Sequence, residues 1–306
     1  MASAPGRRVD AEAQPEVRAM VLSVCSVCSV VNALDLHSCQ HQPPTHRDIT
    51  SVPPDPTLRG LDLDAHLADP ALKQQFVTPM FDIFAPRYDA FTRLFSFGMD
   101  VGWKREMLDT VAPRLAHGAR VMDGACGTGD LAFALLERRA DLRVTGLDAS
   151  TRMIAQAEAA IAVRVRAGAP APGFMVGDLA ALPTNDAELE GLTAGYGYRN
   201  TPDWRAALAD AARAIRPGGY LATLDFYRPA NAVWRTLLLG YLRVAGEVVG
   251  YAWHGHGIVY GYIAPSIAHF CTIAEWEHEL ARLGFVVEAR GVRLLCGVAW
   301  HVARRR

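Results

Sequence analysis

Short apolar runs alternate with stretches of helical periodicity from about residue 118 to the end of the chain. Two of the expected helices carry start signals. Ser150 is the predicted N-cap of a helix that ends at residue 162. Thr201 is the predicted N-cap of a later helix, with Pro202 at its first position. This order predicts an α/β fold with a mostly parallel sheet, helices on both faces and an antiparallel edge. The expected strands cover residues 120–123, 143–147, 173–176, 191–196, 220–226, 285–289 and 292–302.

The beginning of the chain differs from the rest in composition. No Phe, Tyr or Trp precedes Phe76, and seven of the 18 prolines fall within residues 5–56. A segment with so few large apolar side chains has little to pack with, so residues 1–60 are predicted to be a poorly ordered extension. Within it Cys25 and Cys28 resemble half of a zinc site, but no second ligand pair with suitable spacing follows, so no metal is predicted.

Charge and cysteine usage exclude several classes of protein. The chain has 31 Lys and Arg against 32 Asp and Glu, a net charge of -1, so no field that would attract nucleic acid is expected. No apolar run reaches the roughly 20 residues that a membrane-spanning helix needs. Six scattered cysteines do not form a disulfide framework, which favours a cytoplasmic location.

A glycine-rich loop follows the first predicted strand. Asp123 ends that strand, and Gly124, Gly127 and Gly129 permit backbone angles and close approaches that a β-carbon would block. The next strand ends at Asp148, nineteen residues beyond Gly129. A strand, a glycine loop, a helix and an acid at the end of the next strand are typical of a nucleoside site, where the acid binds the ribose hydroxyls.

The spacing within the loop indicates which nucleoside. A dinucleotide loop has the pattern Gly-x-Gly-x-x-Gly around a pyrophosphate, whereas these glycines lie three and then two residues apart. Asp123 and Asp130 flank the loop, and carboxylates suit the cationic amino-acid part of S-adenosylmethionine better than a diphosphate. Asp178 follows the strand at 173–176 and is expected to meet the adenine amino group. The sequence thus predicts a class I, Rossmann-like S-adenosylmethionine-dependent methyltransferase fold with a seven-stranded sheet.

Several motifs then occur in the order typical of one family. They begin with Tyr88-Asp-Ala-Phe-Thr-Arg-Leu-Phe-Ser-Phe-Gly-Met-Asp-Val-Gly-Trp103 and include Tyr260-Gly-Tyr262 near the end. In this order the chain resembles the ubiquinone/menaquinone-biosynthesis C-methyltransferases over roughly residues 77–301. The other motifs are 123–130, Gly177-Asp178 with 181–183, Gly197-Tyr-Arg-Asn200 and Arg216-Pro-Gly-Gly219.

The resemblance implies a set of site residues and a substrate. It places S-adenosylmethionine contacts at Thr128, Asp148, Asp178 and Leu179, with Gly195 where the family often has Ser. It places a polyprenylated quinol near Tyr88, Arg199 and Asn200, which become the candidate catalytic residues. Ionising the hydroxyl next to a ring carbon makes that carbon nucleophilic, and Arg199 can stabilise the phenolate or order a water, although its high pKa makes it a poor base. The alternative for Arg199 is an ion pair with Asp203 or a bond to a carbonyl.

The resemblance also predicts the division of the chain. Residues 61–117 are expected to form a helical cap that contributes to the substrate site, and residues 118–306 the methyltransferase core with a lid near 228–270. The lid departs most from the family, because His254 and His256 precede Tyr260. These imidazoles fit either a base with a pKa near neutrality or ordinary surface positions.

The substrate and the partners leave alternatives open. The expected reaction is ring C-methylation of demethylmenaquinol or its ubiquinone-pathway counterpart. O- or N-methylation of another lipid or aromatic acceptor, and a non-catalytic S-adenosylmethionine-binding scaffold, remain alternatives. The apolar segment 233–249 is either the membrane-facing mouth of a prenyl channel or a lid helix packed on the core. A homodimer is a further open arrangement.

Overall fold

The computed structural model describes two continuous stretches of the chain and several residues that precede them. Of residues 248–254 only the helical backbone is described. The predicted extension at 1–60, Tyr88 and His256 lie outside the described residues, so the predictions about them stay predictions. The described residues are 98–254 and 262–306, together with Asp69, Lys73, Val77, 79–82, Thr92, Arg93 and Ser96.

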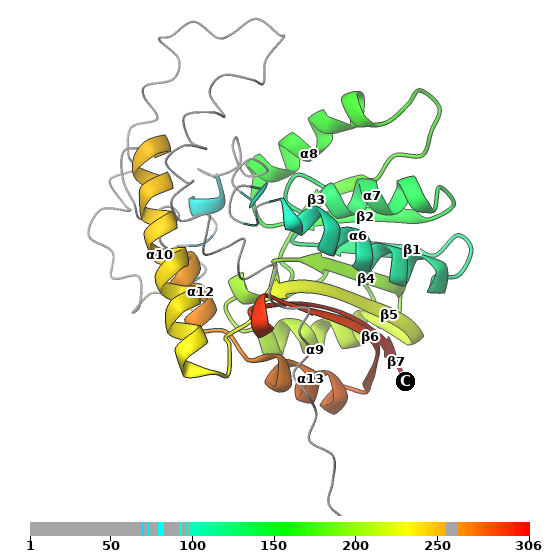
Figure 1. Cartoon of the computed structure of the whole chain (residues 1–306). Coiled ribbons are helices and arrows are strands. Elements are labelled where there is room, and N and C mark those ends of the chain that lie inside the picture. Colours follow the sequence, from blue (N-terminus) through cyan, green and yellow to red (C-terminus); the bar gives the residue numbers. More distant parts are fainter. Residues whose placement is uncertain are drawn as a thin grey trace, which may run out of the picture.

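Seven strands form one sheet in the order β3-β2-β1-β4-β5-β7-β6 (Figure 1). Strands β1 to β5 pair in parallel, while β7 runs antiparallel to both β5 and β6. The predicted α/β class and its antiparallel edge are confirmed. The strands are β1 (Arg120–Gly124), β2 (Arg143–Asp148), β3 (Gly173–Val176), β4 (Leu189–Gly195), β5 (Ile215–Phe226), β6 (Phe285–Arg293) and β7 (Val298–Arg305).

Helices cover both faces of this sheet. In Figure 1 α6, α7 and α8 lie on one side of it, and α9 and α13 on the other. Helix α10 packs against α12, which contacts the short 3-10 turn η5 (Tyr198–Asn200) after β4. The helices are α6 (Met99–Val111), α7 (Asp130–Arg138), α8 (Thr151–Arg164), α9 (Trp204–Ala214), α10 (Ala232–His254), α12 (Ile263–Ala268) and α13 (Ile273–Arg282).

Side-chain caps explain where two of these helices begin. Ser150 caps α8, and its hydroxyl accepts a hydrogen bond from the backbone of Met153 at 3.1 Å, as predicted. The prediction for α9 was wrong. Thr201 Oγ1 donates to the Tyr198 carbonyl at 2.8 Å, whereas Asp203 accepts from two backbone N–H groups and starts the helix at Trp204.

The core consists of one apolar layer on each side of the sheet. Trp276 of α13 and Leu208 of α9 are fully buried in one layer, and Trp103 and Met107 of α6 are buried in the other. The two layers hold the parallel strands rigidly, so the loops at their carboxyl ends start from fixed points. Ligand sites of α/β proteins lie at these loops.

Candidate active site

One cavity lies where strands β2 and β4 end. It holds about 700 Å³ of space between atoms, part of which is open solvent. Val77 and Phe81, which precede the core in the chain, also form part of the cavity wall. The lining residues are Val77, Phe81, Ala125, Gly127, Asp148, Ala149, Ser150, Met153, 177–179, 195–197 and 200–202.

Asp148 lines the cavity at the end of β2. Its Oδ2 accepts a hydrogen bond from the backbone N–H of Gly127 at 2.8 Å, and its Oδ1 accepts from Ser150 at 2.9 Å. Burial raises the pKa of this carboxyl, and the two backbone hydrogen bonds oppose the shift. Each oxygen keeps a lone pair for another donor, so the carboxylate can also accept from ribose hydroxyls.

The glycine loop approaches its neighbours too closely for side chains. A β-carbon on Gly124 would lie 2.5 Å from Leu179 Cδ1, and one on Gly129 would lie 2.8 Å from the ring of Phe174. Gly127 and Gly129 also have φ angles of 54° and 86°, which favour glycine. Gly127 lines the cavity, whereas Gly124, Thr128 and Gly129 are not among the described lining residues.

Asp123 lies beneath the loop instead of in the cavity wall. Its side chain is fully buried, and it accepts hydrogen bonds from Thr193 Oγ1 at 2.8 Å and from the Ala132 N–H at 3.1 Å. Burial raises its pKa to about 7, against the effect of both hydrogen bonds. In this arrangement Asp123 joins β1 to β4 and to the start of α7. Its predicted contact with the cofactor ammonium remains untested.

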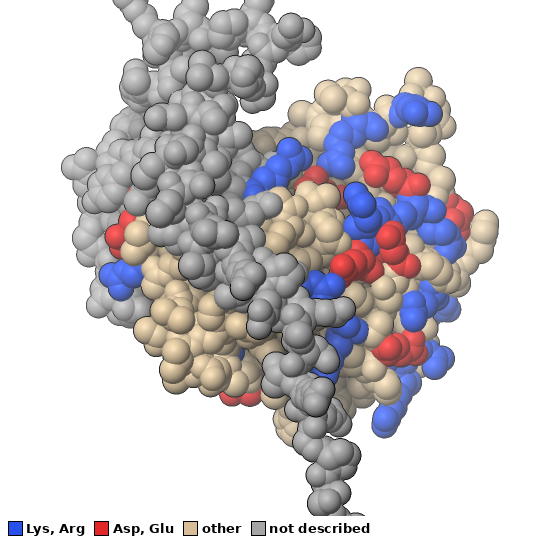
Figure 2. All heavy atoms as spheres, in the orientation of Figure 1, with Lys and Arg blue, Asp and Glu red and all other residues tan. Residues whose placement is uncertain are grey.

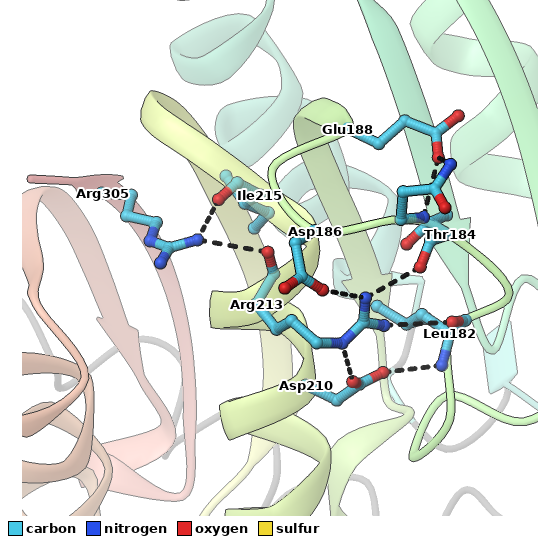
Figure 3. A network of polar contacts seen from close by, with 9 residues as sticks. Leu182, Thr184, Asp186, Glu188, Asp210, Arg213, Ile215 and Arg305 are labelled. Atoms are coloured by element: carbon cyan, nitrogen blue, oxygen red, sulfur yellow. Dashed lines mark hydrogen bonds and ion pairs between the residues drawn. The ribbon is translucent and has the colours of Figure 1, made fainter.

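Asp178 and Leu179 form another part of the wall, and a polar network holds the loop after them (Figure 3). Asp178 Oδ1 accepts from the Ala180 N–H at 2.8 Å. Beyond it, Asp210 of α9 accepts from the Leu182 N–H at 2.7 Å, and Arg213 donates to the Thr184 carbonyl at 2.8 Å and to Asp210 at 2.6 Å. The network ties residues 182–184 to α9, so the two predicted cofactor residues are positioned from outside the cavity.

The predicted catalytic Arg199 forms a buried ion pair. Its Nη1 lies 2.9 Å from Asp225 Oδ1, its backbone N–H donates to Asp225 Oδ2 at 3.1 Å, and Nη1 also donates to the Tyr196 carbonyl. Burial raises the pKa of Asp225, and Arg199 opposes that shift. The partner is therefore Asp225, and not Asp203, which caps α9. Arg199 is not among the described residues that line the cavity.

Asn200, next to Arg199 in the chain, lines the cavity. Its Nδ2 donates to the Tyr196 carbonyl at 2.9 Å, and Gly195, Tyr196 and Gly197 continue the wall. Tyr262 is buried behind this turn. Burial raises the pKa of the Tyr262 hydroxyl, while hydrogen bonds from Arg199 and Asn200 lower it. The ring of Phe81 packs edge-on against Tyr262 at 6.3 Å between centroids.

Several of these residues were not predicted as site residues. Tyr262 was recognised only as part of a motif, and no role was predicted for Asp225. Lys73 was not recognised at all. The sequence signal for Asp225 is an acid at the end of β5, the strand that pairs with β4. Tyr88 and the His256 imidazole lie outside the described residues, and so does the side chain of His254.

The residues present fit S-adenosylmethionine. The cavity offers carboxylates at Asp148 and Asp178, an apolar wall at Leu179, and a loop that excludes β-carbons where it approaches that wall. Together with the strand order, this arrangement defines an S-adenosylmethionine-dependent methyltransferase.

Comparison with known proteins names the family. The model of the ubiE/COQ5 methyltransferase family matches residues 70–304, so the chain belongs to that family. The demethylmenaquinone methyltransferase of Deinococcus radiodurans is 34% identical over 72% of this chain and 86% of that protein. That of Thermus thermophilus is also 34% identical, over 74% of this chain and 100% of that protein. The ubiquinone/menaquinone biosynthesis C-methyltransferase UbiE of Geobacter sulfurreducens is 30% identical over 70% and 82%.

Solved structures agree on the fold. A chain of the complex between the Haloferax volcanii Trm112 methyltransferase activator and a methyltransferase matches with a TM-score of 0.50 at 18% identity, over 73% of this chain and 96% of that chain. Within the described residues, none of the helices is long and apolar enough to cross a membrane. The same residues contain no cluster of three or more His, Cys, Asp and Glu side chains placed to bind a metal ion.

Proposed function

We propose that the protein methylates a ring carbon of a prenylated quinol, demethylmenaquinol or its ubiquinone-pathway counterpart. The proposal rests on one cavity whose wall has two parts of different chemistry. Asp148, Asp178 and Leu179 suit S-adenosylmethionine, while Asn200, Phe81 and Tyr196 offer an amide and aromatic surface to a flat acceptor. The two relatives named demethylmenaquinone methyltransferase support the same acceptor class.

The proposed chemistry assigns separate tasks to the predicted residues. When bound, S-adenosylmethionine supplies an electrophilic methyl group on a sulfonium sulfur. Asn200 lines the cavity, and in this proposal it hydrogen-bonds an acceptor hydroxyl and so orients the ring. Arg199, paired with Asp225, holds the turn that carries Asn200 and adds positive charge near the phenolate that forms. Tyr88 stays in the proposal on the strength of the resemblance alone.

The acceptor's prenyl chain requires an apolar surface, and α10 offers one. Val233, Leu237 and Val244 are 71%, 59% and 62% exposed, with Gly240 between them, so they follow one face of the helix. The opposite face is buried, and Trp234 Nε1 donates to the Leu294 carbonyl at 2.9 Å. We therefore propose that α10 is both a helix packed on the core and a surface that lies against a membrane.

A genetic replacement tests the proposed function. A bacterium that lacks its own demethylmenaquinone methyltransferase would express this chain, and its quinones would be extracted and analysed by mass spectrometry. We expect the quinone pool to gain one methyl group with the wild-type chain. The Asp148→Asn variant, produced at the same level, should leave most of the pool demethylated, and Asp141→Asn, whose side chain pairs with Arg139, should behave as wild type. A demethylated pool with abundant wild-type protein would contradict the proposal.

A further inference from the structure

Lysine is rare in this chain, and one of its lysines is buried beside the site. Of the 31 basic residues only Lys73 and Lys104 are lysines, and the others are arginines. Lys104 lies on α6, where it pairs with Asp100 at 3.3 Å and Asp130 at 3.4 Å. Lys73 is only 8% exposed. A buried cation needs polar partners that replace the hydration it has lost.

Lys73 joins two segments that both line the cavity. Its Nζ donates to the backbone carbonyl of Arg199 in η5 at 2.8 Å, and the contact is buried. Lys73, Val77 and Phe81 each have helical backbone and follow one another at intervals of four residues. Val77 and Phe81 line the cavity together with Asn200. One hydrogen bond thus connects the turn that carries Asn200 to the segment that carries Val77 and Phe81.

The other end of the same segment is also tied to the site. Asp82 Oδ1 accepts a hydrogen bond from Ser150 Oγ at 2.5 Å, and Arg152 donates to the Asp82 carbonyl at 3.3 Å. Ser150 lies two residues after Asp148 and also lines the cavity. The wall formed by Val77 and Phe81 is therefore held between two polar contacts, one on each loop of the cofactor site.

The surroundings of Lys73 favour an amine over a guanidinium. Burial, and after it the charge of Arg199, lower the pKa of Lys73 to about 8, against the effect of the carboxylates of Asp225 and Asp203. A lysine that loses its proton can still donate to the Arg199 carbonyl, so the contact survives without a second buried cation beside Arg199. An arginine at this buried position would keep its charge.

We infer that Lys73 is a positioning residue of the methyltransferase site. Its hydrogen bond to the Arg199 carbonyl holds the Val77–Phe81 wall against η5 and so shapes the cavity around the cofactor. Neither the resemblance nor the proposed acceptor requires this role. It concerns cofactor binding and can be tested without any acceptor.

Calorimetric titration with S-adenosylmethionine tests the inference on the full chain. Lys73→Met keeps the apolar stem and removes the donor. We expect its dissociation constant to rise at least tenfold, while the thermal midpoint of the cofactor-free protein stays the same or rises, because a buried cation has been removed. Lys73→Arg should not restore the affinity, and the control Lys104→Met should bind within twofold of wild type. A Lys73→Met protein that binds within twofold of wild type would overturn the inference.

Nuclear magnetic resonance of protein labelled at the lysine ε-carbon provides a second readout. With only two lysines, Lys104→Met assigns both signals at once. The Lys73 signal should titrate near pH 8, as its burial requires. Titration near the ordinary value of about 10.4 would show an exposed amine and no such contact. Because neither measurement uses a quinol, failure of the proposed acceptor leaves this test intact.

Discussion

Burial, more than hydrogen bonding, determines the protonation of the acids at the strand ends. Asp123, Asp148 and Asp225 all have raised pKa values with burial as the largest cause, although each accepts at least two hydrogen bonds. Such acids cost stability when they ionise in the folded protein. The site therefore holds carboxylates that remain responsive to pH.

Asp123 should make the stability of the protein depend on pH. Its folded-state pKa of about 7 exceeds the value of about 3.9 for an unfolded carboxyl, so the native state binds the extra proton between pH 4 and 7. The contribution of Asp123 to the free energy of unfolding thus falls as pH rises through that window. Asp123→Asn lacks this titration, and its stability relative to wild type should increase from pH 4 to 7 in urea denaturation. A difference that does not change with pH would contradict the assignment.

Removing one partner of the Arg199–Asp225 ion pair should strongly lower the stability of the protein. Asp225→Asn leaves the Arg199 charge buried without its partner, and we expect a loss of about 3–5 kcal/mol in the free energy of unfolding. The double variant Arg199→Met with Asp225→Asn should recover part of that loss, because both charges are then absent. Urea denaturation of wild type, the single variants Arg199→Met and Asp225→Asn, and the double variant measures the coupling. Additive losses would show that the two side chains act independently.

At the scale of elements, local patterns predicted strands and helices well but not the contacts between them. The glycine loop and the acid of Asp148 are neighbours in one strand–loop–helix unit, so their placement followed from sequence. The partner of Arg199 could not be predicted in this way. Asp203 is four residues away in sequence, but Asp225 is brought next to Arg199 only by the parallel pairing of β4 with β5. The start of α9 was misplaced for a similar reason, because Thr201 and Asp203 are both good caps and the fold of η5 decides between them.

The turn after β4 gives a prediction about packing between elements. Gly197 has ordinary helical angles, but an added β-carbon would lie 2.8 Å from Ala125 Cβ and 3.2 Å from Leu179 Cδ2. Gly197→Ala should therefore push apart two parts of the cavity wall and weaken S-adenosylmethionine binding at least tenfold in calorimetry. Gly102→Ala on α6, with nothing within 4 Å of the new carbon, should bind as wild type and gain about 0.5–1 kcal/mol in stability. Equal affinity of the two variants would refute the steric argument.

At the scale of the whole molecule, the surface combines interspersed charges with exposed apolar residues on α10, where the Arg243–Glu247 ion pair is also exposed. Figure 2 shows acidic and basic side chains interspersed over the described part of one face, and mostly uncharged residues over the lower part of α10. This face offers no extended basic surface to a nucleic acid. An exposed apolar helix face on an otherwise mixed surface is the arrangement expected of a protein that binds a membrane peripherally.

Membrane contact through α10 is tested by two matched substitutions. Val233→Glu places a charge on the exposed face of α10, and Val163→Glu places the same charge on α8, where Val163 is 87% exposed. With vesicles of phosphatidylethanolamine and phosphatidylglycerol, Val233→Glu should reduce co-sedimentation severalfold while Val163→Glu has little effect. Both variants should bind S-adenosylmethionine normally. Equal sedimentation of the two variants would exclude α10 as the contact.

Methyl transfer to a quinol ring carbon can be followed in a single reaction. Purified protein would be incubated with S-adenosylmethionine that carries a ¹³C-labelled methyl group and with chemically reduced demethylmenaquinone. The position of the label in the product would then be read by NMR. We expect a methyl carbon bonded to the quinone ring, formed by wild type and lost or strongly reduced in Asn200→Ala. A label on oxygen, or no transfer by a protein that binds the cofactor, would contradict ring C-methylation.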